Sequence, residues 1–247
     1  MKFSHFIKIA LGILAGYLAL FFIVNAFFQF VFPIKASDLM SLAMSSAWGI
    51  LPIFLVSFTL TFAVLIYLFN SWLERKWVRI KWPDIILFMG IAAAIGPTAE
   101  IIVNTLARTF LGEPFWLYQL FPVHGGDTSL VMSVIWPVYG FHIYCFHAAL
   151  KARYDKTEDI DLALFIGMDA ITLEVLANLF SLSFFYTFIF YYLAGDLRHL
   201  STAVIFIPYV LGGYLAIKIL HFLEKNHHRV FWGITGFIWN WFIIFSF

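Results

Sequence analysis

The chain has 247 residues, of which 63% are hydrophobic and 12% are charged, and its formal net charge is +1. So few polar residues cannot cover the surface of a water-soluble globule of this size, and we therefore expect a single transmembrane helical domain over residues 1–247. The absence of a basic face interleaved with aromatic residues outside the apolar runs predicts that nucleic acid is not a partner.

Apolar runs of nearly constant length follow one another along the chain. A helix needs about 20 such residues to cross the ~30 Å hydrocarbon layer of a bilayer. We therefore predict an all-α, polytopic integral membrane protein with seven transmembrane helices. They are expected at Ile9–Val31, Trp48–Asn70, Asp84–Thr105, Thr128–Leu150, Leu162–Phe184, Thr202–Glu224 and Val230–Phe247. The first run lacks a small-residue cleavage site and is interpreted as a retained helix.

Lysine and arginine are divided unequally between the two sets of connections. Only Lys35, Arg108 and Arg198 fall on one side, and the remainder of the 15 basic residues fall on the other. The positive-inside rule then predicts a cytoplasmic N-terminus and an outside C-terminus, in a multi-pass protein of the cell or inner membrane. The basic connections are expected to contact the anionic headgroups of the lipid bilayer.

Three carboxylates lie inside the predicted helices, at Glu100, Asp169 and Glu174. An ionisable side chain in hydrocarbon costs about 2.5–3.5 kcal/mol on insertion scales, and such residues usually face a bundle interior or a water-filled cavity. A neutral amide would join helices at lower cost. These three residues are therefore the predicted catalytic groups.

Polar neighbours extend this pattern in the third and fifth helices. Asn104 lies four residues after Glu100, and Asn178 lies four residues after Glu174, so that each pair shares one helical face. Helical rise places Asn25 at a similar depth, and we expect one outward-opening cavity between the first, third and fifth helices. The simpler alternative is that the amides only form hydrogen bonds between helices, worth about 0.6 kcal/mol each. The predicted substrate-binding residues are Asn25, Asn104, Asn178, Trp136, Tyr139, His142, His124 and Asp127.

Two further patterns concern polar pairs. His142 and Asp169 fall at similar depth on consecutive helices, which predicts an imidazole–carboxylate contact that is either a proton relay or a structural pair. His124 and Asp127 flank Gly125 and Gly126 in the connection after the third helix. Because no recognised metal-ligand spacing is present, no metal site is predicted, and a cofactor is left undetermined.

Family signatures exclude several seven-helix classes. The last apolar run has no lysine for a retinal Schiff base, the zinc-binding His-x-x-x-His of progestin-receptor and ceramidase hydrolases is absent from it, and the Pro-Gln repeats of sugar transporters are absent from the chain. In size, helix number and intramembrane carboxylates the chain resembles the integral-membrane terpene cyclases. That resemblance is architectural, and no shared motif carries it.

Two classes of function fit the polar pattern. The first is a membrane-embedded enzyme that acts on a lipophilic substrate, such as an isoprenoid or another lipid, by carboxylate acid–base chemistry in the outward-opening cavity. The alternative is a proton-coupled transporter or channel that uses the same carboxylates, and a second alternative is a structural or assembly subunit. No internal repeat is predicted, and the polar groups gather in the outer half without a continuous path, which favours the enzyme.

Overall fold

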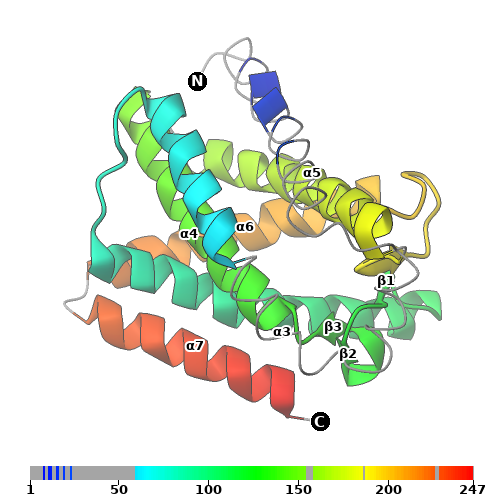
Figure 1. The fold of residues 1–247 in the computed structure, drawn as a ribbon. Coiled ribbons are helices and arrows are strands. Elements are labelled where there is room, and N and C mark those ends of the chain that lie inside the picture. The colour runs from blue at the N-terminus through cyan, green and yellow to red at the C-terminus, as the bar shows by residue number, and fades with distance from the viewer. Residues whose placement is uncertain are drawn as a thin grey trace.

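The computed structural model describes residues 59–153, 158–185, 187–225 and 228–246, together with residues 8, 11–12, 15–16, 19 and 23. The described chain is mostly helical (Figure 1). Its helices are the segment Thr59–Glu74, α3 (Trp82–Leu111), α4 (Met132–Arg153), α5 (Asp159–Phe185), α6 (Phe206–Glu224) and α7 (Arg229–Phe245). The predicted first span falls almost wholly outside the described residues.

Four short strands correct the prediction of a purely helical chain. Strand β1 (Trp116–Tyr118) pairs antiparallel with β4 (Phe190–Tyr192), and β2 (Pro122–Val123) pairs with β3 (Thr128–Ser129). Two 3₁₀ turns, η1 (His124–Gly126) and η2 (Ala203–Ile205), complete these connections. Aromatic residues favour extended backbone, and in β1 and β4 they occupy most positions.

Helix α3 is longer than the sequence predicted, and its ends explain why. It begins at Trp82 with a proline in its first turn, where the missing amide has no helical partner to lose. It continues past Thr105 because no helix breaker occurs before Gly112. That glycine has a φ of 85°, and its amide donates to the carbonyl of Arg108, which closes the helix.

Glycines set the distances between helices. A Cβ atom on Gly90 of α3 would lie 2.0 Å from the carbonyl oxygen of Gly233, and one on Gly236 would lie 2.1 Å from the carbonyl oxygen of Gly90. The backbones of α3 and α7 therefore touch, and α7 lies along α3 (Figure 1). Such small-residue contacts are typical of helix packing within membranes.

Two of the described helical segments, Trp82–Leu111 and Ala203–Glu224, are long and apolar enough to cross a membrane. The segments Thr59–Glu74 and Arg229–Phe245 are apolar but shorter. The length and composition of these two helices are consistent with membrane association. They do not by themselves establish seven transmembrane helices.

Candidate functional site

Glu100 is the centre of a set of hydrogen-bond donors. It lies in α3, it is buried, and it accepts bonds from the Tyr118 hydroxyl and the Trp136 Nε1–H, at 2.6 and 3.0 Å, on Oε1. Thr128 of β3 donates to Oε2 at 2.5 Å. Gly96 makes this arrangement possible, because a Cβ at that position would lie 2.0 Å from the Trp136 ring.

Glu174 of α5 has a matching set of donors. The hydroxyl groups of Tyr192 and Tyr209 both donate to Oε1, the first at 2.7 Å, and Ser201 donates to Oε2 at 2.6 Å. Strand β4 supplies Tyr192, and helix α6 supplies Tyr209. Among the described residues, the hydrogen-bond donors to this carboxyl group are all hydroxyl groups.

The two strand tyrosines remain protonated over the physiological range. Burial, with the nearby Glu100 carboxylate, raises the pKa of the Tyr118 phenol well above its ordinary value. Burial, with Glu174, does the same to the pKa of Tyr192. Each phenol therefore keeps the hydrogen that it donates.

Asn104 and Asn178 hold the backbone at the two strands that supply the tyrosines of Glu100 and Glu174. Asn104 accepts from the Phe115 amide at 3.0 Å and donates to the Trp116 carbonyl at 3.0 Å. Asn178 accepts from the Ile189 amide at 3.0 Å and donates to the Phe190 carbonyl at 2.9 Å. Both side chains are fully buried, so each amide fixes the strand that carries a tyrosine.

These contacts form an internal repeat, which corrects the expectation that none exists. The tyrosine follows its glutamate by 18 residues in both halves, and the strand carbonyl follows its asparagine by 12 residues in both. The unit α3–β1–α4 is thus repeated as α5–β4–α6. The strands of the two units pair about Leu117 and Tyr191, so the two strands are related by a local twofold axis.

Both glutamates line one cavity of about 130 Å³. Its wall is mainly apolar and aromatic, and most of the wall comes from α4 and α5. Among its lining residues are Phe62, Tyr118, Trp136, Tyr139, His142 and Tyr209. A second cavity of similar volume, about 130 Å³, borders Glu100, Trp136, Tyr139 and Tyr209 from the side of α6. A dry cavity of about 150 Å³ admits benzene, so each space suits a reacting fragment of about that size.

The predicted contact between His142 and Asp169 is confirmed. Nε2 of the imidazole lies 3.2 Å from Oδ1 of the carboxylate, and both side chains are buried. The Asn70 amide lies 3.4 Å from Nδ1. One tautomer, with hydrogen on Nε2, satisfies both contacts. His142 also lines the cavity shared by the glutamates, so this pair adjoins the candidate site.

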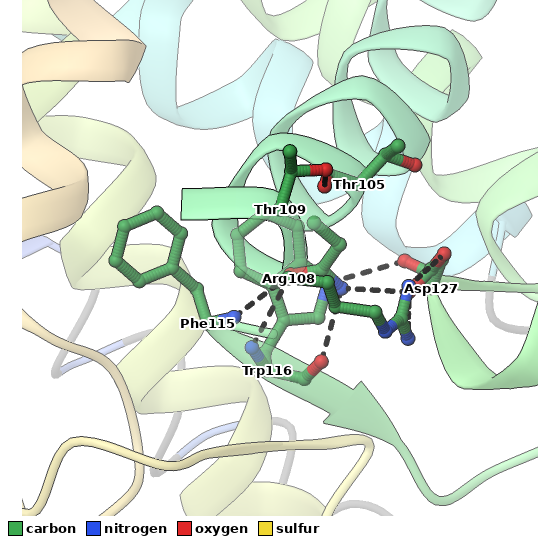
Figure 2. A network of polar contacts seen from close by, with 7 residues as sticks. Thr105, Arg108, Thr109, Phe115, Trp116 and Asp127 are labelled. Carbon is green, nitrogen blue, oxygen red and sulfur yellow. Dashed lines mark hydrogen bonds and ion pairs between the residues drawn. The ribbon is translucent and has the colours of Figure 1, made fainter. Parts of the chain in front are cut away.

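Asp127 belongs to a separate cluster at the strand end of the molecule. Figure 2 shows the Arg108 guanidinium directed at its carboxylate. The two nitrogen–oxygen distances are 2.5 and 2.6 Å, and the Asn104 amide donates to the same carboxylate at 3.1 Å. This bidentate pair holds the connection that leads to Thr128, and thereby one donor of Glu100.

His124 is not among the residues that line the cavity. Nε2 of His124 lies 2.6 Å from the carbonyl oxygen of Ile243, so this imidazole joins the connection to α7. Asn25 lies outside the described residues. The structure thus brings Glu100, Glu174 and their aromatic neighbours together.

Sequence reasoning did not find five of the residues that bond to the glutamates. They are Tyr118, Thr128, Tyr192, Ser201 and Tyr209. The available signal was the recurrence of Glu-x-x-x-Asn followed by an aromatic strand at constant spacing.

Among the described residues, no group of three or more His, Cys, Asp or Glu side chains is placed to hold a metal ion. No family model, curated protein or solved structure matches the chain. The geometry of the site is therefore the basis for assigning a function.

Proposed function

We propose that the protein is a membrane-embedded enzyme that transfers protons to and from a lipophilic substrate, with Glu100 and Glu174 as the catalytic acid and base. The observation that supports it most directly is the shared cavity, in which carboxyl groups from two helices face a mainly apolar, aromatic space. The alkyl part of a lipid suits such a wall, and the two carboxyl groups that line it are able to carry a proton.

The aromatic wall adds a reason to favour this chemistry. Protonation of an alkene, an epoxide or a carbonyl group creates positive charge on the substrate. The faces of Trp and Tyr rings attract a cation by about 0.5–2 kcal/mol each, more where water is excluded. Trp136, Tyr139 and Tyr209 line both cavities and are placed to supply this stabilisation.

The membrane setting is part of the proposal. Large apolar side chains are exposed along the outer faces of α6 and α7, where lipid would cover them. They include Ile207, Leu211, Leu215 and Phe222 on α6, and Phe231, Ile238 and Phe242 on α7. With seven spans and the basic connections in the cytoplasm, the paired strands β1 and β4 lie at the outer end.

A proton-coupled transporter is the second candidate, and the internal repeat favours it. Transporters are often built from repeated helical units with the substrate site at their interface, and the glutamates lie at the interface between two such units. The His142–Asp169 pair beside the cavity would then be a second proton carrier.

Solvent deuterium distinguishes the two functions even though the substrate has yet to be identified. Purified protein is incubated in ²H₂O with a total lipid extract of its host membrane, and the lipids are analysed by mass spectrometry. We expect one lipophilic species to gain deuterium or change retention with the wild-type protein, and neither effect with Glu100→Gln or Glu174→Gln. If the wild-type protein changes no lipid but carries a pH-driven flux in proteoliposomes, the result would reject the proposed enzyme and support the transporter.

A further inference from the structure

The two repeated carboxyl sites differ at one position. The third donor of Glu100 is the indole N–H of Trp136, whereas the third donor of Glu174 is the hydroxyl of Tyr209. The remaining donors correspond, since each glutamate has one strand tyrosine on Oε1 and one Ser or Thr on Oε2.

We propose that this difference assigns the roles within the proposed enzyme: Glu174 is the carboxylic acid that protonates a lipid alkene, and Glu100 is the carboxylate that removes a proton from the resulting cation. The inference depends on the proposed function for its chemistry. The protonation states themselves are argued from the hydrogen-bond geometry and from the cavity that the two carboxyl groups share.

The hydrogen-bond donors of the two glutamates differ in whether they can also accept a hydrogen bond. An indole N–H can only donate, so Oε1 of Glu100 must remain an acceptor, and a proton on Glu100 is confined to Oε2, next to the Thr128 hydroxyl. A hydroxyl can donate or accept, and every partner of Glu174 is a hydroxyl. A proton on either oxygen of Glu174 therefore finds an acceptor when one neighbouring hydroxyl turns.

Repulsion between the two carboxyl groups also limits their charge. The two carboxyl groups line the same mainly apolar cavity. Two like charges in such a space disfavour each other, as in carboxyl pairs that share one proton. With one proton for the pair, the site with the fixed N–H donor keeps the charge, and the site with hydroxyls alone keeps the proton.

The reaction that follows needs no co-substrate. The O–H bond of Glu174 breaks as its hydrogen forms a C–H bond with one alkene carbon, and the bonding electrons stay on the carboxylate. The cation forms next to the aromatic wall. Glu100 then takes a proton from a neighbouring carbon, and the electrons of that C–H bond form a new double bond. A proton transfer from Glu100 to Glu174 restores the resting enzyme, so the product is an isomer or a cyclised form of the substrate.

Infrared spectroscopy tests the assignment on the protein without substrate. We expect the wild-type protein to show a protonated-carboxyl C=O band that shifts in ²H₂O, that disappears in Glu174→Gln, and that persists in Glu100→Gln. Asp169→Asn is the control for the other carboxylate beside the cavity, and it should leave the band unchanged. A band that disappears in Glu100→Gln and persists in Glu174→Gln, or the absence of a band in wild type, would overturn the assignment.

A conservative pair of variants tests the cause. Trp136→Phe removes the N–H and keeps a ring, and we expect Glu100 then to gain a proton and add a second band. Tyr209→Phe leaves Glu174 with two hydroxyls and should keep one band. A Trp136→Phe spectrum identical to wild type would contradict the role of the indole. Because no lipid is needed, the assignment can fail while deuterium labelling succeeds, and labelling can fail while the assignment holds.

Discussion

The fully buried amide of Asn104 offers a sharp test of how the site is supported. Replacement by leucine keeps a similar volume and removes every polar atom of the side chain. The Phe115 amide and the Trp116 carbonyl then lose partners at 3.0 Å, while Asp127 keeps its bidentate contact with Arg108. A buried polar group without a partner costs about 1–3 kcal/mol, so two of them cost roughly 2–6 kcal/mol.

The assay is thermal unfolding of the purified protein in detergent. For a chain of this size, 1 kcal/mol shifts the melting temperature by about 2–4 °C, so a cost of about 4 kcal/mol corresponds to a decrease of roughly 8–16 °C. Thr109→Leu is the matched control, because Thr109 is exposed on the same helix and donates to the Thr105 carbonyl within its own helix. We expect this control to change stability by less than about 0.5 kcal/mol.

The internal repeat makes the test stricter. Asn178→Leu removes the equivalent contacts at β4 and also the bond to the Leu200 carbonyl at 2.8 Å, so its cost should be at least as large as that of Asn104→Leu. If Asn104→Leu melts at the same temperature as the Thr109→Leu control, the Asn104 amide does not hold strand β1, and the proposed support of the site is refuted. If only one asparagine variant is destabilised, the two units are not equivalent.

Three further predictions concern packing, pH and topology. Gly90→Ala places a Cβ against the backbone of α7 and should destabilise the protein by about 1–3 kcal/mol, whereas Gly212→Ala, with open space around it, should be neutral or stabilising in a melting assay. The Ala203 amide holds the pKa of Asp196 below its ordinary value of 3.8, so this contribution to stability is present above that value and is lost as the pH falls through the lowered pKa. Amide hydrogen exchange at Ala203 should therefore become faster at low pH in the wild type. The same acceleration in an Asp196→Asn variant would argue against this role of Asp196. A tag after Phe247 should be accessible from outside intact cells and a tag at the N-terminus should not, and two tags on one side would exclude the seven-span arrangement.

Periodicity and hydropathy predicted the positions of the main helices, because these signals extend over many residues. The end of α3 was placed too early, since the sequence between Thr105 and Gly112 is less apolar yet contains no breaker. The contact of His142 with Asp169 could be predicted because helical rise alone relates the depths of two neighbouring helices.

The partners of the glutamates could not be predicted in the same way. Strands β1 and β4 have three residues each, which is too short for an alternating pattern to stand out in an apolar chain. A single sequence also does not reveal that the buried amides of Asn104 and Asn178 bond to the backbone of the strand segments. The repeat is hard to detect in the sequence because, apart from the glutamates, the asparagines and the strand tyrosines, its equivalent contacts use different residues, such as Thr128 in one unit and Ser201 in the other.

The pairing of β1 with β4 has a mechanical consequence. Tyr118 and Tyr192 extend from the two strands of one short ladder, and each phenol reaches the glutamate of its own unit. Separation of the strands would therefore draw both phenols away from both carboxyl groups in a single movement. The ladder therefore links the hydrogen bonds of the two glutamates mechanically.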